Sequence, residues 1–232
     1  GSAASRFRVL IDRAYESTGK PVVILIDEYD KPVVDNIAEE SLSDIFRKQL
    51  QGFYSVMKAK DKYIKFGFLT GVTKIGKLSV FSGLNNLKDI SLDARYTSIC
   101  GISEKELKKY FKESVRDLAE ANDISAKKCY SLLAQMYDGY HFRQNSAGIY
   151  NPFSALSTFD SGEFDNYWFE TATPSFLVRF LQQGNYKLDD INRDKVSVSM
   201  LKGVNSERPN AITLLYQTGY LTIKDYDPQF RR

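Results

Sequence analysis

Along the first hundred residues, segments with apolar side chains at helical spacing are interspersed with short apolar runs typical of strands. Residues 5–17 carry apolar side chains at helical spacing, and Gly19 to Pro21 end that helix. The unbroken apolar run Val22 to Ile26 predicts a parallel strand that is buried on both faces. A second helix is predicted over about 43–60, and a second strand over 63–70. This order of elements predicts an α/β fold in which helices connect the strands of a parallel sheet.

The pattern after about residue 102 predicts mostly helices. Ser103 and Glu106 have the spacing of a capping box and open a helix over 103–122. Further helices are predicted over 125–137 and after Asn151-Pro152 and Thr173-Pro174.

The tail from Asn210 predicts a helix, a turn at Gly219 and then a strand of alternating character. We therefore predict two domains. The first is an α/β core over 1–102, and the second, over 103–232, is mostly helical with a small β element at its end.

Composition narrows the class of protein. The 232 residues are 43% hydrophobic and 13% aromatic, enough to bury a substantial core. A net charge of +3 is too small to predict nucleic-acid binding by itself. Two cysteines far apart in the sequence do not form a disulfide framework, and no apolar run reaches the ~20 residues that cross a bilayer. These features favour a cytoplasmic protein without a membrane segment.

Two adjacent carboxylates, Asp27 and Glu28, follow the first predicted strand directly. The carboxyl edge of a parallel sheet is where ligands bind in open α/β folds. An apolar strand followed by Asp-Glu is the Walker B pattern of nucleoside triphosphatases. In that chemistry Asp27 holds Mg²⁺ directly or through water, and Glu28 orients the attacking water. A strand that merely ends in acidic residues at an exposed turn is the alternative interpretation.

The partner motif of Walker B is Walker A, whose backbone N–H groups surround the phosphates. The one near match is the segment Gly71 to Leu78, which follows the second predicted strand. Leu78 stands where a hydroxyl should bind magnesium, and the residues beyond it read as a loop rather than a long helix. The segment also follows Walker B instead of preceding it. We interpret this match as a coincidence.

Several motifs in order resemble the AAA-ATPase-like family of bacterial P-loop ATPases. They are LIDEYDKPVVDN, FLTGVTKIGKLSVFSGLNNLKDISLD, YTSICGISEKELKKYF, MYDGYHF, YNPFSAL, YWFETATPSFLVRFL and LLYQTGYLTIKDYD, and they extend over about residues 5–227. Members typically carry a P-loop before this region and often a PD-(D/E)XK nuclease-like domain after it. The resemblance implies a partial P-loop (AAA/ASCE-like) sheet, and a chain that lacks both of those parts.

The resemblance also implies roles for particular residues. Asp27 and Glu28 correspond to the Walker B pair, with Asp27 as the magnesium and nucleotide ligand and Glu28 as the catalytic base. Thr70, at the end of the second strand, resembles the sensor-1 residue that reads the γ-phosphate. Lys74 and Lys77, in the loop beyond, would face phosphate or a neighbouring subunit.

The helical half resembles the lid of such ATPases, and its end resembles a winged helix. Within it, His141 or Arg143 would contact the nucleotide. His141, the only histidine, is more simply a turn residue with a local hydrogen bond. Asp30 is expected to fix the turn at Lys31-Pro32.

The expected function is that of an ATPase-domain fragment. Its parent would hydrolyse Mg-ATP, with a homo-oligomer as one possible assembly, and the fragment would be weak or inactive without its P-loop. The alternative is a protein- or DNA-interaction module of a nuclease-associated protein, using Lys202, Arg208 and Lys224, with salt-sensitive binding. A phosphatase or nuclease centre built from Asp27, Glu28 and Asp30 is a third hypothesis.

Overall fold

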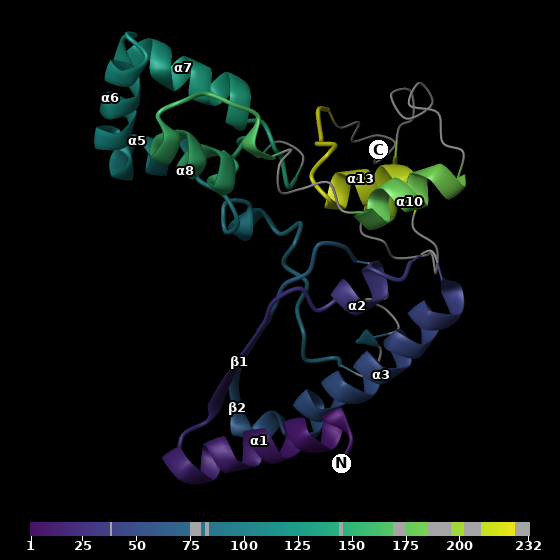
Figure 1. Ribbon diagram of the computed structural model, residues 1–232. Coiled ribbons are helices and arrows are strands. Elements are labelled where there is room, and N and C mark those ends of the chain that lie inside the picture. Colours follow the sequence, from purple (N-terminus) through teal and green to yellow (C-terminus); the bar gives the residue numbers. More distant parts are fainter. Residues whose placement is uncertain are drawn as a thin grey trace. The chain divides into compact units, whose positions relative to one another are not determined.

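The computed structural model describes residues 1–37, 39–74, 80–81, 84–143, 146–168, 175–184, 196–201 and 210–225 (Figure 1). The chain divides into two compact units. One contains Gly1–Lys88 and Ser175–Thr218, and the other contains Asp89–Pro174 and Gly219–Arg232. Each unit is discontinuous in sequence, whereas the predicted division at residue 102 is a single cut. That division stays a prediction.

The helices and strands predicted for the first eighty residues are confirmed. The predicted helices are α1 (Ala3–Thr18) and α3 (Glu40–Ala59), and the predicted strands are β1 (Val22–Ile26) and β2 (Ile64–Leu69). The structure adds two short helices that were not predicted, α2 (Lys31–Val34) and the 3₁₀ helix η1 (Asp61–Tyr63). The two strands pair in parallel, so the segment between them, which includes α3, is a crossover connection. The described residues thus form a mixed α/β structure with a two-stranded parallel sheet and mostly helices.

Local chemistry sets the ends of α1. The Ser2 side chain accepts a hydrogen bond from the Ser5 N–H at the start of the helix, and Gly19 ends it with a φ of +64°. The Phe7 ring of α1 stacks on Phe53 of α3, with the ring centroids 4.5 Å apart. The two helices therefore share one apolar layer against the sheet.

The sheet is covered on one face only by the described residues, so the prediction of a strand buried on both faces is wrong here. Ile24 of β1 is buried, and its partner Gly67 in β2 lies close to Met57 of α3. The opposite face carries two cross-strand pairs, Val23 with Phe66 and Leu25 with Phe68.

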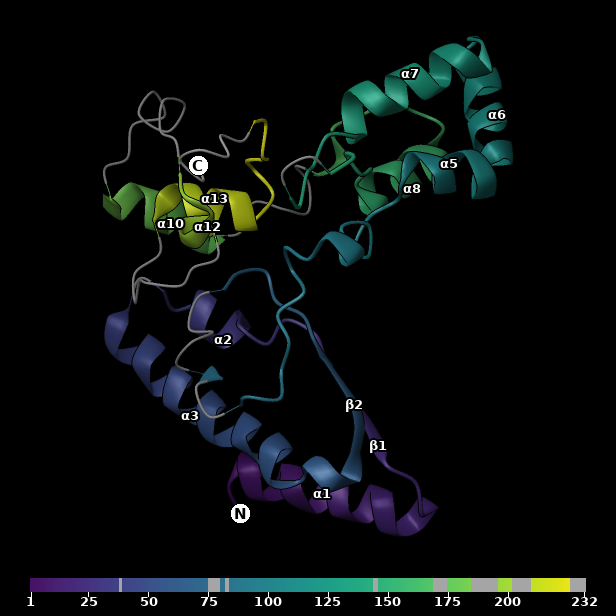
Figure 2. The ribbon, with the colours of Figure 1, turned by 180° about the vertical axis from the view of Figure 1, so that it is seen from behind.

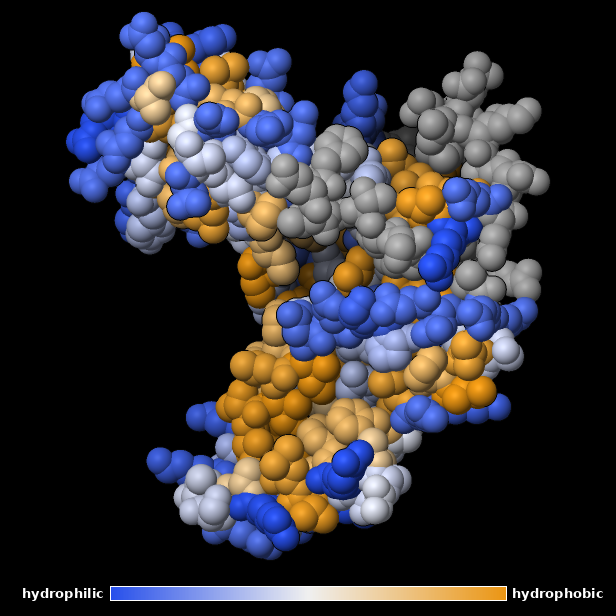
Figure 3. Space-filling view, in the orientation of Figure 1, coloured by the Kyte–Doolittle hydropathy of each residue, from blue (hydrophilic) through white to orange (hydrophobic). Residues whose placement is uncertain are grey.

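This second face, which we call the open sheet face, is apolar and exposed. Val23 is 52% exposed, Leu25 71% and Phe66 54%. Figure 3 shows the corresponding hydrophobic surface over the strands. The apolar run of β1 fits two buried faces, but the helices in the described part pack on only one of them.

Among the described residues, three further helices belong to the first unit. They are α10 (Ser175–Gly184), α12 (Val198–Leu201) and α13 (Ala211–Gln217). Leu177, Leu201 and Leu214, one from each helix, are buried. The Asn210 side chain accepts from the Ile212 N–H and fixes the start of α13.

The second unit is built around a helical core. Its elements are the 3₁₀ helix η2 (Ala94–Tyr96), α5 (Glu104–Tyr110), α6 (Lys112–Ala121), α7 (Ala126–Tyr137) and α8 (Pro152–Ser161) (Figure 2). The capping box of Ser103 and Glu106 is confirmed. The single helix predicted over 103–122 is wrong, because it breaks into α5 and α6 at Phe111, whose ring stacks on Phe159 of α8.

The strand predicted after Gly219 is not formed by residues 220–225. Instead, side-chain contacts hold this segment within the second unit. The Tyr220 ring meets Trp168 edge to face, and the Thr222 hydroxyl accepts from the His141 N–H at 2.7 Å. A strand needs a neighbour for its backbone groups, and residues 226–232 lie outside the described ones. Among the described helices, none combines the length and apolar character needed to cross a bilayer.

Candidate functional site

Asp27, Glu28 and Thr70 meet at the carboxyl ends of the two parallel strands. Asp27 follows the last residue of β1, and Thr70 follows the last residue of β2. The Thr70 hydroxyl donates a hydrogen bond to Oδ1 of Asp27. The Glu28 N–H lies 3.1 Å from the same oxygen and 3.4 Å from the Thr70 hydroxyl. The three residues therefore form one polar cluster, which we call the carboxylate cluster.

Backbone hydrogen bonds extend the strand pairing into this cluster. The Thr70 N–H donates to the Ile26 carbonyl at 2.8 Å, and the Tyr29 N–H donates to the Thr70 carbonyl at 2.8 Å. Thr70 is thus bonded through its N–H to the last residue of β1, and through its carbonyl and its side chain to the segment that follows β1. The position of its hydroxyl depends on the pairing of the strand ends.

Glu28 adopts an uncommon backbone conformation. Its φ is +50°, in the left-handed region that side chains with a Cβ rarely occupy. Asp27 and Glu28 are both exposed, whereas the next two residues, Tyr29 and Asp30, are buried. The turn at Glu28 therefore separates a solvent-facing pair of carboxylates from a buried pair of side chains.

The buried Asp30 side chain holds the start of the loop after β2 by hydrogen bonds. The side chain is 1% exposed. One carboxylate oxygen accepts from the Val72 N–H at 3.1 Å, and the other accepts from the Thr73 N–H at 2.6 Å and the Thr73 hydroxyl at 2.7 Å. Burial raises the pKa of Asp30 above its usual 3.8, and the hydrogen bonds from Thr73 and Val72 oppose that rise.

Gly71 permits this close packing. A Cβ at Gly71 would lie 2.6 Å from the Asp30 carboxylate and 2.6 Å from the Tyr29 ring. The Tyr29 hydroxyl also donates to the Thr73 carbonyl at 3.1 Å. The loop that begins at Gly71 is therefore held by two consecutive buried side chains, and only glycine fits at its first position.

The same contacts bear on the near match to Walker A. The Val72 and Thr73 N–H groups are already bonded to Asp30, and the Lys74 N–H donates to Gln217 Oε1 at 2.8 Å. In a phosphate-binding loop such N–H groups would point at the ligand. Residues 75–79, with Lys77, lie outside the described ones. The described part of the segment thus favours the interpretation of the match as a coincidence.

The carboxylate cluster suits magnesium better than a metal held by protein ligands alone. Asp27 is exposed, and only its Oδ1 accepts hydrogen bonds from described residues. No group of three or more His, Cys, Asp or Glu side chains in the described part of the chain could hold a metal. Mg²⁺ takes one or two carboxylates and completes its shell with water and phosphate oxygens. Asp30, with both oxygens bonded to the loop, does not support the phosphatase or nuclease hypothesis.

The residues expected from the helical half belong to the second unit. The His141 ring Nδ1 lies 2.8 Å from the Ser146 carbonyl, which is the local hydrogen bond that the sequence suggested. The Ser146 N–H in turn donates to the Arg143 carbonyl. A role of Arg143 toward nucleotide stays a prediction. Of the residues expected to contact DNA, Lys224 is exposed, while Lys202 and Arg208 lie outside the described residues.

Two residues of this site were not found from the sequence. Asp30 was assigned to the Lys31-Pro32 turn, and its carbonyl does accept from the Val33 and Val34 N–H groups there, but its side chain holds the loop after β2. Gln217 links that loop to α12, because its amide donates to the Leu201 carbonyl at 3.0 Å. A polar residue in the otherwise apolar run of α13 was the only available signal.

A protein-family model matches the first part of the chain. Residues 1–81, which contain α1, the sheet and the carboxylate cluster, match a family model described as a predicted AAA-ATPase. This match supports the assignment of residues 1–81 to the AAA-ATPase-like family, which the sequence motifs indicated. The family description points to nucleotide binding in general.

A relative extends the similarity beyond this segment. The chain is 37% identical over 219 residues to an uncharacterized protein in the vnfD 5′ region of Azotobacter chroococcum mcd 1. The alignment covers 94% of this chain and 40% of the relative, so the chain spans less than half of that protein's length. No solved structure matches the chain.

Proposed function

We propose that the chain supplies the magnesium-binding and water-activating half of an Mg-ATP hydrolysis site. The observation that carries the proposal is the convergence of Asp27, Glu28 and Thr70 at the carboxyl ends of two paired parallel strands. This edge is where ligands bind in parallel α/β sheets. The family of residues 1–81 supports the same class of activity.

Each residue has a distinct role in this proposal. Magnesium, when bound with the triphosphate, neutralises charge that develops on the phosphate oxygens. Asp27 holds the ion directly or through a water, with its free Oδ2 toward solvent. Glu28 orients the attacking water and takes its proton. Thr70 holds the Asp27 carboxylate in place and presents its hydroxyl toward the terminal phosphate.

In this proposal, the backbone N–H groups that surround the phosphates are not those of the loop after β2. The N–H groups of Val72, Thr73 and Lys74 are bonded within the chain, so these described positions after β2 are occupied by protein contacts. Lys74 and Arg143 remain candidates for side-chain contacts to nucleotide. We expect residues 1–232 alone to hydrolyse ATP weakly or not at all, because a P-loop lysine and its backbone donors make the principal phosphate contacts.

Steady-state ATP hydrolysis with Mg²⁺ tests the proposal. The assay compares residues 1–232 with a form extended at its N-terminus by a segment that contains a Walker A sequence. The extended form should turn over at about 1 per second or faster. Glu28→Gln should lower that rate at least about a hundredfold while nucleotide binding persists.

Glu16→Gln is the matched control, since Glu16 is an exposed glutamate on α1 away from the carboxylate cluster. It should leave the rate unchanged. Hydrolysis by neither form, or equal rates for the Glu28→Gln and Glu16→Gln variants, would overturn the assignment of this site.

A further inference from the structure

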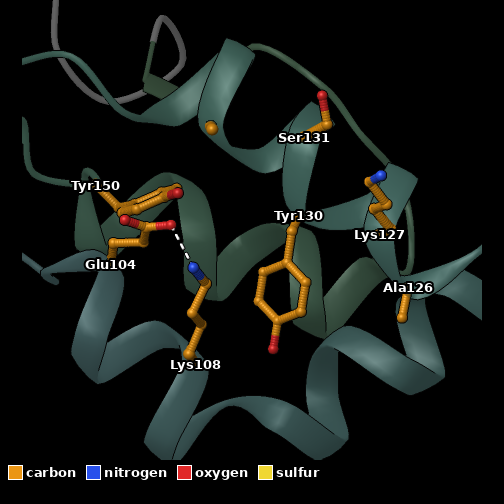
Figure 4. A pocket seen from close by; sticks show the side chains of 8 residues that line it. Glu104, Lys108, Ala126, Lys127, Tyr130, Ser131 and Tyr150 are labelled. Carbon is orange, nitrogen blue, oxygen red and sulfur yellow. Dashed lines mark hydrogen bonds and ion pairs between the residues drawn. The ribbon is translucent and has the colours of Figure 1, made fainter.

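The second unit contains a pocket that includes no residue of the carboxylate cluster. It lies between α5 and α7, and its volume is about 530 Å³, within the range of small-molecule sites. Figure 4 shows Tyr150, Glu104 and Lys108 toward one side, Lys127 and Ser131 toward the other, and Tyr130 between them. The lining consists of Glu104, Lys108, Ala126, Lys127, Tyr130, Ser131, Ala134 and Tyr150.

Tyr150, a largely buried residue, lines this pocket, and the hydrogen bonds among the described residues do not include its hydroxyl. The residue is 2% exposed, and its backbone is fixed by hydrogen bonds of 2.9 and 3.1 Å with Ile102. A hydroxyl that no described residue binds can form a hydrogen bond with a molecule that enters the pocket.

The hydroxyl is fitted to donate a hydrogen bond. Burial, followed by the negative charges of Asp138 and Glu104, raises the pKa of Tyr150 to about 12. The group therefore keeps its proton across the physiological range. An acceptor oxygen on a ligand is the complementary partner.

Lysine side chains outnumber carboxylates in the lining of this pocket. Lys108 is paired with Glu104 at 2.5 Å, which neutralises the one carboxylate of the lining. Lys127 stands on the other side of the pocket, and a neighbouring hollow on α5 adds Lys105 and Lys109. The excess of lysine favours an anion, for which the ammonium group is a common partner.

The remaining lining suits a planar or apolar body. Tyr130 is half-buried in the middle of the pocket, and Ala126 and Ala134 of the same helix leave room beside its ring. Flat aromatic groups stack on tyrosine rings. A ligand that satisfies every part of the lining therefore combines an anionic oxygen-rich group with a flat body.

We propose that this pocket binds a small organic phosphate, an aryl or nucleoside monophosphate. Its phosphate accepts the hydrogen bond of Tyr150 and lies near Lys127, and its planar part packs on Tyr130. This site is separate from the carboxylate cluster, and it requires neither magnesium nor hydrolysis.

Titration of the 232-residue chain with phenyl phosphate, followed by two-dimensional NMR in magnesium-free buffer, tests the proposal. We expect saturable binding with a dissociation constant of about 1 mM, as befits so small a ligand. Tyr150→Phe should weaken binding about tenfold, the loss of one hydrogen bond to a charged group. Its melting temperature should not fall, because the hydroxyl has no partner in the described protein.

Three comparisons make the test decisive. Lys127→Gln should weaken binding about threefold to tenfold, whereas Lys128→Gln, at the adjacent exposed position of α7 outside the lining, should not. Asp27→Asn should bind phenyl phosphate like the unaltered chain, which separates this site from the proposed ATP site. AMP should bind at least as tightly as phenyl phosphate, and inorganic phosphate more weakly. No saturation up to about 10 mM, equal affinities across the variants, or equal affinity for inorganic phosphate would overturn the proposal.

Discussion

The Thr70 hydroxyl donates a hydrogen bond to the Asp27 carboxylate across the ends of β2 and β1. The two residues are separated by 43 positions in the sequence, yet each stands immediately after its strand. Because the parallel pairing continues through the Thr70 N–H to Ile26, the sheet itself sets this contact. Replacement of Thr70 should therefore remove its own hydroxyl and also disturb the orientation of the Asp27 carboxylate.

Thr70→Val removes the hydroxyl with little change in side-chain volume. We expect ATP hydrolysis by the extended form to fall about tenfold to a hundredfold, because a hydrogen bond to a carboxylate contributes about 1.5–3 kcal/mol. Thr70→Ser keeps the hydroxyl and should retain most of the rate. Steady-state kinetics at varied magnesium concentration would measure the effect, and a Val variant as active as the Ser variant would contradict the role of Thr70.

Asp30→Asn should destabilise the first unit. The amide cannot accept at both positions, so it leaves a buried N–H or hydroxyl of Thr73 without an acceptor, at a cost of about 2–4 kcal/mol. Asp35→Asn is the control, since Asp35 forms an exposed ion pair with Lys31 that contributes less than about 1 kcal/mol. Urea denaturation of both variants would compare the two free energies of unfolding, and equal losses would show that the Asp30 contacts carry no special weight.

The pKa of Asp30 also predicts a pH dependence. Its folded-state pKa is raised above 3.8 by burial, so between 3.8 and that raised value the folded chain binds more protons than the unfolded chain. The contribution of this group to stability therefore falls as the pH rises through that window. The free energy of unfolding, measured from pH 4 to pH 7, should show this trend in the parent chain. The contribution of Asp30 to this trend should be missing from the Asp30→Asn variant. Identical pH profiles of the free energy of unfolding for the parent chain and the variant would contradict a raised pKa of Asp30.

Two glycines should respond in opposite directions to alanine. Gly71→Ala places a Cβ 2.6 Å from both Asp30 and Tyr29, so we expect a loss of about 1–3 kcal/mol and displacement of the loop. Gly52→Ala lies within α3, where nothing is within 4 Å of the added Cβ, and should gain about 0.5–1 kcal/mol. Thermal denaturation would distinguish them. A neutral Gly71→Ala would mean that the contacts between Asp30 and the loop are easily rearranged.

Adjacent residues of β1 should separate the covered face of the sheet from the open sheet face. Ile24→Thr, on the covered face, should cost about 1–3 kcal/mol, because a hydroxyl enters the core. Leu25→Thr, on the open sheet face, should cost less than about 0.5 kcal/mol and should reduce binding of a hydrophobic dye and self-association. Denaturation and sedimentation velocity would measure both effects, and a large loss of stability in Leu25→Thr would show that this face is covered in solution.

Patterns of short range correctly predicted both strands and several helices of the described residues. The apolar run of β1, the helical spacing of α3 and the capping box of Ser103 each lie within one segment of the chain, so the sequence displays them directly. The break at Phe111 was not predictable in this way. It depends on Phe159, which is 48 residues away and gives no local signal.

The site shows the same limit. Asp27 and Glu28 could be named because they follow a recognisable strand, and Thr70 because the motif around it resembles a known family. The side-chain role of Asp30 could not, since its partners Val72 and Thr73 are 42 and 43 residues away. The exposure of Leu25 could not be predicted for a related reason. An apolar run shows that a strand is suited to burial on both faces, but only the packing of the other elements shows which face is covered.

The backbone of Glu28 bears on how this position would vary under selection. A glutamate at a φ of +50° costs about 1 kcal/mol relative to glycine, and asparagine also tolerates that conformation better. A library of variants sorted for folding alone should therefore drift toward glycine or asparagine at this position. A library sorted for ATP turnover should keep glutamate. A difference between the two libraries at this position would show that Glu28 is retained for activity at a cost in stability.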